Sequence, residues 1–297
     1  MNAVESLRKT VVEELMSLNT MHKVWPSWSK IIVGLCKETN TNGAEIQEIG
    51  NQLFSIFKST SEGRGQADVS GGGAAWEALV CWYLNLCLLG SRTVVIKAKK
   101  ANIPTCILNA ISVNYGNFPS NTESDLLAVT FPSDQALQMA FVGDHKTLMK
   151  TINQVVESRF KEVELGIIQC KTNWNDNAQI PMLWDLIYAS KGFSTNARVG
   201  SNGFSHSQFA KFSYSFVTVP TVKPEKFKPT STAVMRVRNL SGGNYWGLKG
   251  EPGIALNLFA IIQQNFATSH GEYPNGWHLD IVKEITQMKN NNNYFRL

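Results

Sequence analysis

The amino-acid sequence predicts an α/β fold, a mixed central β-sheet flanked by helices, with an N-terminal helical region before it. Apolar residues recur at helical spacing within residues 1–60, and a nearly all-apolar helix is expected at 74–89. Short apolar strands then alternate with helical segments, the pattern of a central sheet covered by helices. No repeat or sharp boundary divides the chain. We therefore expect a single domain over residues 1–297, with its core at 70–220.

The N-terminal region has two stretches of helical periodicity, and Pro26 is expected to interrupt the chain between them. The apolar positions are Val11, Val12, Leu15 and Leu18, then Ile46, Ile49, Leu53 and Ile56. The Gly-rich segment 61–73, SEGRGQADVSGGG, is expected to be a connector that turns into the next helix. That helix, AAWEALVCWYLNLCLL, is apolar nearly all round, which places it in the middle of the fold.

The remaining elements follow from alternation and from turn residues. Strands are expected at TVVIKA (93–98), DLLAVTF (125–131), VELGIIQCK (163–171) and KFSYSFVTVP (211–220). Helices are expected at 134–160, 181–190 and 254–268. Turns, loops or connectors are expected at 114–124, 172–179, 220–232 and 241–250, and the Asn run 290–293 is expected to lie in a loop or tail.

Composition narrows the class of protein. Hydrophobic content of 43% and charged content of 17% are ordinary for a globular protein, and a net charge of +5 is compatible with a nucleic-acid partner. Five scattered cysteines without a CxxC pair indicate a reducing cytoplasm, and with five scattered histidines no zinc-type ligand cluster is evident. The N-terminus lacks the apolar core of a signal peptide, and no apolar stretch reaches the roughly 18 residues of a membrane span. We therefore expect a cytoplasmic protein.

The strand 163–171 carries polar side chains where it leaves the core. Alternation places Gln169 and Lys171 on the same face as the apolar Leu165 and Ile167. Metal-assisted phosphodiester hydrolysis needs such a place, with an oxygen ligand for Mg²⁺ and a cation beside the attacking water or the phosphate. For an isolated Gln-x-Lys, a strand running out into solvent is the more frequent explanation.

Two carboxylates add to this pattern. Asp125 opens the strand 125–131 and could stand beside Gln169 on a neighbouring strand, although Asp also commonly caps a turn. Glu77 lies inside the apolar helix, where an unpartnered charge is costly. Either a metal ion or a salt bridge to a Lys or Arg would stabilise it.

A helix Glu, then a strand Asp, then a strand ending in (D/E/Q)xK resembles the PD-(D/E)XK nuclease superfamily, and within it the type II restriction endonucleases. The resemblance spans roughly residues 70–190, in SGGGAAWEALVCWYLN, NTESDLLAVTFP and ELGIIQCKTNWNDNAQIPMLWD. It implies that Asp125 binds metal and that Lys171 is catalytic. Gln169 stands where the family usually has Asp or Glu, and Ser124 replaces the proline of the motif. Glu77 is then expected to support the metal site.

The same resemblance implies a restriction-modification enzyme of a bacterial cytoplasm. It would cleave double-stranded DNA at specific sequences with Mg²⁺ and leave 5′-phosphates. Palindromic sites favour a homodimer, and a cognate DNA methyltransferase is expected as a neighbouring gene rather than as a subunit. Two alternatives stay open: a repair or junction-resolving nuclease of the same fold, and a DNA-binding protein with a decayed site, which the neutral Gln169 favours.

Three polar segments are candidates for contacts with DNA. The loop after Lys171 offers amides that could read base edges, although a plain polar turn explains them equally well; they are Asn173, Asn175, Asp176 and Gln179. A second loop has the same ambiguity, with Ser201, Asn202, Ser205, His206 and Ser207. The lysines of the Pro-rich connector could touch phosphates or be merely solvated; they are Lys223, Lys226 and Lys228.

Other catalytic motifs are missing from the sequence. SGGG is not followed by GK[ST], as a phosphate-binding P-loop requires, and there is no GxSxG. Cys170 lies on the face opposite Lys171 and is expected to be a buried core thiol.

Overall fold

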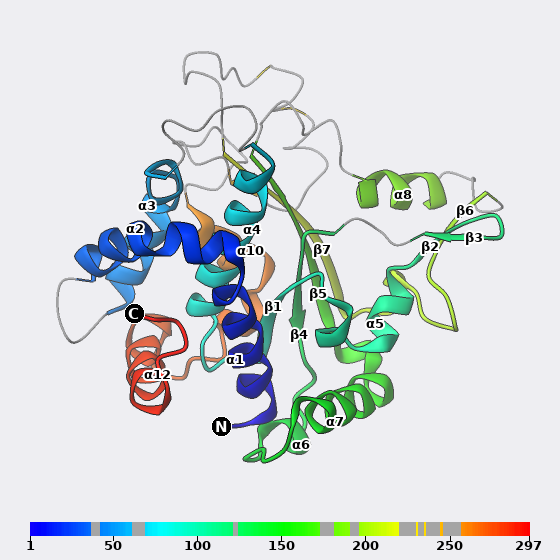
Figure 1. Ribbon diagram of the computed structural model, residues 1–297. Coiled ribbons are helices and arrows are strands. Elements are labelled where there is room, and N and C mark those ends of the chain that lie inside the picture. Colours follow the sequence, from blue (N-terminus) through cyan, green and yellow to red (C-terminus); the bar gives the residue numbers. More distant parts are fainter. Residues whose placement is uncertain are drawn as a thin grey trace.

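The structure, a computed structural model, has a mixed α/β architecture with one five-stranded and one three-stranded sheet (Figure 1). It describes residues 1–36, 42–60, 69–120, 124–172, 181–190, 196–219, 230, 235, 244–245 and 257–297.

The five-stranded sheet forms the centre of the molecule, as predicted. Its order is β1 (Thr93–Lys97), β4 (Leu126–Thr130), β5 (Glu164–Lys171), β7 (Lys211–Thr218) and β8 (Asn244–Tyr245). The first three strands are antiparallel neighbours, whereas β5, β7 and β8 run parallel. The sheet is therefore mixed. The two residues of β8 lie within a segment for which the sequence predicted only a turn.

A second, small antiparallel sheet was not predicted. It consists of β3 (Phe118–Ser120), β2 (Val113–Tyr115) and β6 (Ala197–Val199), in that order. Gly116 turns the chain between β2 and β3 with a φ of 57°, a conformation that glycine adopts without strain. The turn-rich sequence there forms a hairpin, and α8 (Pro181–Ser190) packs beside β6 (Figure 1).

The helices lie on both sides of the central sheet. Figure 1 shows α4 (Val69–Cys87) and α10 (Leu258–Asn265) on one side, and α5 (Thr105–Ala110) and α7 (His145–Ser158) on the other. The other helices are α1 (Ala3–Met16), α2 (Asn19–Leu35), α3 (Gly43–Lys58), α6 (Gln135–Gln138), α11 (Ala267–His270) and α12 (Trp277–Asn291), with short 3₁₀ turns at Lys100–Asn102, Phe160–Glu162 and His206–Gln208. Within the described residues, no helix is both long and apolar enough to cross a membrane.

Helices were predicted correctly through most of the N-terminal region, but their boundaries were not. The helical region is interrupted at Ser17 and Leu18, between α1 and α2. Pro26 lies inside α2, so the predicted interruption at Pro26 is wrong. Trp25 and Trp28 beside it are buried, and this packing stabilises the helix despite the hydrogen bond that proline cannot donate. Gly71, Gly72 and Gly73 belong to α4 rather than to a connector, and residues 61–68 of the predicted connector lie outside the described residues.

The C-terminal segment also differs from the expected tail. α12 buries Trp277, Ile281, Ile285 and Met288 at helical spacing, and its last residues include the first two asparagines of the Asn run. Phe295 is fully buried, and its carbonyl accepts a hydrogen bond from Trp82 Nε1 at 3.1 Å. A long-range contact with α4 therefore fixes the end of the chain. The predicted helix at 254–268 is seen from residue 257 as α10 followed by α11.

Helix α4 is buried in the middle of the fold, as predicted, and it completes the hydrogen bonding of the sheet. Trp76, Trp82 and Tyr83 are all fully buried. The side chain of Asn85 accepts from the backbone N–H of Val95 at 3.0 Å and donates to its carbonyl at 2.7 Å. Since β1 is an edge strand, these backbone groups have no neighbouring strand to pair with.

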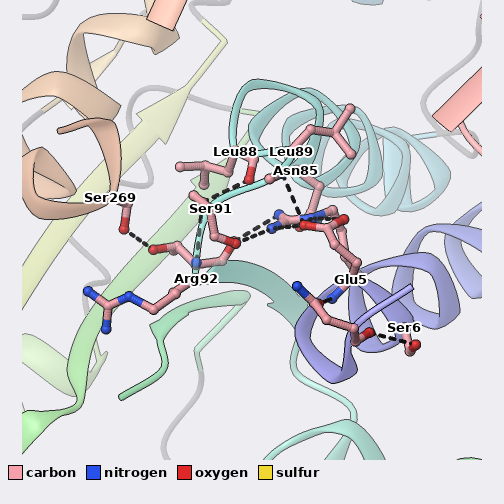
Figure 2. A network of polar contacts seen from close by, with 12 residues as sticks. Glu5, Ser6, Asn85, Leu88, Leu89, Ser91, Arg92 and Ser269 are labelled. Atoms are coloured by element: carbon pink, nitrogen blue, oxygen red, sulfur yellow. Dashed lines mark hydrogen bonds and ion pairs between the residues drawn. The ribbon is translucent and has the colours of Figure 1, made fainter. Parts of the chain in front are cut away.

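Arg8 of α1 extends the same cover over the edge of β1. Its guanidinium is fully buried and donates to the carbonyls of Thr93 at 2.8 Å and Ser91 at 2.9 Å. Glu5 balances the charge through an ion pair at 3.0 Å. Figure 2 shows this network, in which Glu5, Asn85 and Ser91 come together from three parts of the chain. Buried polar groups of this kind are stabilising only when all are paired.

Arg8→Met should therefore destabilise the protein strongly. The substitution leaves two buried carbonyls without their donor and removes the positive charge that balances Glu5, which typically costs about 3–5 kcal/mol. Urea denaturation followed by circular dichroism measures the change. Lys9→Met is the matched control, because Lys9 makes only a partly exposed pair with Glu13 and should change stability by less than about 1 kcal/mol. Equal effects of the two substitutions would contradict this role of Arg8.

Candidate functional site

Asp125 and Gln169 meet at one end of the central sheet. Leu126 pairs with Ile168, so the antiparallel register brings the preceding residue, Asp125, to the level of Gln169. The Asp125 Oδ2 atom accepts hydrogen bonds from Gln169 Nε2 at 2.6 Å and from the backbone N–H of Cys170 at 2.7 Å. The predicted proximity of these two side chains is confirmed.

Gln169 is fully buried, and only one end of its amide is satisfied. Its Nε2 atom donates to Asp125, whereas its Oε1 atom has no hydrogen-bond partner among the described residues. The opposite amide orientation would place two acceptor oxygens against each other, so the carboxylate fixes the observed one. An unpaired buried acceptor costs about 1–3 kcal/mol, which a cation or a donor bound at Oε1 would offset.

Lys171 is the last residue of β5 and is partly exposed. It lies two residues after Gln169, so strand alternation places both side chains on one face. The positive charge of Lys171 acts to lower the pKa of the Cys170 thiol, although burial dominates and raises that pKa. Strand alternation thus places a cation on the same face as Gln169, two residues along β5.

Glu77 forms an ion pair with Lys97, the last residue of β1, with 3.0 Å between Oε2 and Nζ. The structure thus contains the salt bridge that was the alternative to a metal site. After burial, the negative charges of Asp125 and then Glu77 are the main causes that raise the pKa of Cys170. Both carboxylates therefore lie near this thiol. Strand alternation places Cys170 on the face opposite Gln169, and α4, the helix that carries Glu77, contacts β5.

Two hydroxyl groups of β7 near this site were missed by the sequence analysis. In the parallel register, Tyr214 lies beside Ile167 and Thr218 beside Lys171, on the face that carries Gln169. Both side chains are buried, and neither hydroxyl has a hydrogen-bond partner in the described parts of the chain. Alternation in KFSYSFVT places Tyr214 and Thr218 on one face of their strand. Only the pairing of β5 with β7 brings that face beside Gln169.

The candidate DNA-reading loop, with Asn173, Asn175, Asp176 and Gln179, lies outside the described residues, as do Lys223, Lys226 and Lys228. The second polar loop is described, and its side chains hold the fold together. Ser201 Oγ accepts from Ser112 Oγ at 2.8 Å and donates to the carbonyl of Asn109. Ser205 and Gln208 form a capping box. These contacts favour a structural role for that loop.

The residues at the strand end fit a hydrated divalent cation. Over the described part of the chain, no group of three or more His, Cys, Asp and Glu side chains could hold a metal ion. Mg²⁺, however, is commonly held by one or two carboxylates plus waters, and amide oxygens are suitable ligands. Asp125 supplies a carboxylate, and the unpaired Gln169 Oε1 supplies a second oxygen next to it.

Comparisons of the chain with family models, with curated proteins and with solved structures each found no match.

The burial of the cysteines gives a test of how closed this strand end is. Burial raises the pKa of Cys81 to about 12 and that of Cys106 to about 11, and it also raises the pKa of Cys87 and Cys170. At pH 8 an aromatic disulfide reagent should therefore react with about one thiol, the half-buried Cys36, because only accessible thiolates attack it. All five cysteines should react in denaturant.

Cys36→Ser should reduce the native thiol count nearly to zero, whereas Cys170→Ser should leave it unchanged. A lower native count in Cys170→Ser would show that the strand end beside Asp125 is open to the reagent.

Proposed function

We propose that the protein is a Mg²⁺-dependent nuclease that cleaves double-stranded DNA at specific sequences, like the type II restriction endonucleases of the PD-(D/E)XK superfamily. The observation that supports this most is the meeting of Asp125 with Gln169 across neighbouring strands, with Lys171 next on the same face. These are the three positions that the motif requires to be adjacent. The mixed sheet with helices on both sides is compatible with such a core.

In this proposal, Asp125 and Gln169 hold the ion through a carboxylate and an amide oxygen. Rotation of the Gln169 amide would turn Oε1 toward Asp125, where Nε2 now lies 2.6 Å from Oδ2. Two oxygen ligands of an octahedral ion with bonds of about 2.1 Å lie about 3 Å apart, so a small separation suffices. The bound ion supplies positive charge at the phosphate and lowers the pKa of a water molecule.

Lys171 provides the charge that the metal ligands do not. Positioned beside the ion, its ammonium group stabilises negative charge that develops on the phosphate oxygens and orients the attacking water. It is partly exposed, so substrate can reach it.

Glu77 is the third oxygen group that we assign to the metal site, and Lys97 competes for it. Gln169 is neutral, so Asp125 alone would oppose the charge of the cation there. Glu77 would restore the missing negative charge by exchanging its ion pair with Lys97 for the metal or its waters. With two lysines near two carboxylates, the site without an ion is close to neutral. We therefore expect weak Mg²⁺ binding, in the millimolar range or close to it.

The partner we propose is double-stranded DNA, read as a palindrome by a homodimer. The net charge of +5 is compatible with that partner. A repair or junction-resolving nuclease would prefer nicked or branched DNA to linear DNA, and a binder with a decayed site would shift DNA without cutting it. A panel of plasmid, linear and branched substrates with Mg²⁺ separates the three: discrete plasmid fragments support the restriction enzyme.

Lys171→Ala should reduce cleavage by about 10²–10³-fold, because one preorganised charge is lost from the transition state. DNA binding in a mobility-shift assay without Mg²⁺ should change little. Lys161→Ala is the control, since Lys161 is exposed in the 3₁₀ turn before β5, at the end of the strand opposite Lys171. Cleavage by Lys171→Ala within a few-fold of the unmodified protein would rule out its catalytic role.

Glu77→Gln should reduce cleavage more than stability. The amide keeps the shape of the side chain but loses its charge, while the partly exposed ion pair with Lys97 contributes little to folding. Gln169→Glu should be tolerated and should rescue part of the loss by returning a negative charge. Plasmid cleavage rates and thermal unfolding of both variants and their combination are the measurements. Unchanged cleavage by Glu77→Gln would leave Glu77 as a structural partner of Lys97.

A further inference from the structure

Unpaired buried polar atoms gather on one face of β5 and β7. Six buried side-chain N or O atoms lack a hydrogen-bond partner among the described residues, and three of them belong to Gln169, Tyr214 and Thr218. The register places these residues around one another, since Tyr214 and Thr218 flank Phe216, which pairs directly with Gln169. Each unpaired group costs about 1–3 kcal/mol, so three together point to a bound polar ligand.

Tyr214 lies on the face of the sheet that carries Gln169, because it pairs with Ile167, two residues before Gln169 in β5. The ring is buried, with 5% of the residue exposed. Burial raises the pKa of Tyr214, and the negative charge of Asp125 raises it further. The strand has phenylalanine at positions 212 and 216 on the same face, so a ring without a hydroxyl is accommodated beside it.

We infer that Tyr214 is a further positioning residue of the cation site, where its hydroxyl binds a water molecule in the hydration shell of the ion. This inference rests on the proposed function, because it assumes that Asp125 and Gln169 hold the cation. Mg²⁺ keeps several of its waters when it binds to protein. Groups that bind such waters orient the first ligands and raise metal affinity, and removing one typically costs 10–100-fold in affinity.

Because the Tyr214 hydroxyl is unpaired among the described residues, its removal separates an effect on metal affinity from an effect on folding. Tyr214→Phe removes an oxygen atom that has no hydrogen-bond partner among the described residues, so thermal stability should stay the same or rise. Affinity for Mn²⁺, measured on the full chain without DNA by electron paramagnetic resonance, should fall by about tenfold. Mn²⁺ serves as the probe because it takes the same oxygen ligands as Mg²⁺ and its free form is directly visible.

Two variants control this measurement. Tyr273→Phe removes a hydroxyl that donates to the Leu89 carbonyl at 2.8 Å, so it should lower the melting temperature and leave Mn²⁺ affinity unchanged. Asp125→Asn removes the carboxylate that contacts Gln169 directly, so it should abolish most of the Mn²⁺ binding.

The outcomes separate the inference from the function on which it rests. If Tyr214→Phe binds Mn²⁺ as tightly as the unmodified protein while Asp125→Asn does not, the role of Tyr214 is wrong and the cation site stands. A loss of stability in Tyr214→Phe equal to that in Tyr273→Phe would also overturn it, because the hydroxyl would then have a protein partner. If the unmodified protein and Asp125→Asn bind Mn²⁺ alike, both proposals fail.

Discussion

The cover over the edge strand β1 is the constraint on which the rest of the structure depends. A buried edge strand needs partners for its outward N–H and C=O groups, and here side chains supply them. Asn85 of α4 bonds both backbone groups of Val95, and Arg8 of α1 bonds the carbonyl of Thr93. These contacts fix two helices against the sheet and protect its edge from pairing with another chain. Leaving one of these buried polar groups unpaired would destabilise the fold, so the network favours this one arrangement of α1, α4 and β1.

The positions of the candidate site residues depend on the register of β1, β4 and β5. Lys97 at the end of β1 pairs with Leu126 at the start of β4, and Leu126 pairs with Ile168, three residues before the end of β5. This register places Asp125 beside Gln169, and it places Lys97 within reach of Glu77 of α4. A shift of one residue in either pairing would move these side chains to the other face. The apolar core that fixes the strand register therefore also fixes the positions of these side chains.

Charge balance decides how such a site can work. Asp125 is shared between an amide and a backbone N–H, and Glu77 is paired with a lysine, so neither carboxylate lacks compensation. A divalent cation would have to replace these weaker partners, and the polar atoms left unpaired on the Gln169 face are the groups that would gain from it. This arrangement favours a site that assembles around its ion rather than one that is fully formed beforehand.

The sequence by itself determined the elements whose signal is local. The apolar run of α4, the strand ending in Gln169 and Lys171, and the strand opened by Asp125 follow from periodicity. Their order allowed Asp125 to lie beside Gln169, and the pairing of β4 with β5 decided it. Only the tertiary structure decided that Lys97 is the partner of Glu77, that Tyr214 shares the face of Gln169, and that the hairpin β2–β3 forms where a turn-rich stretch was expected. These features depend on contacts between distant segments, which stabilise a helix or strand that its own residues favour only weakly.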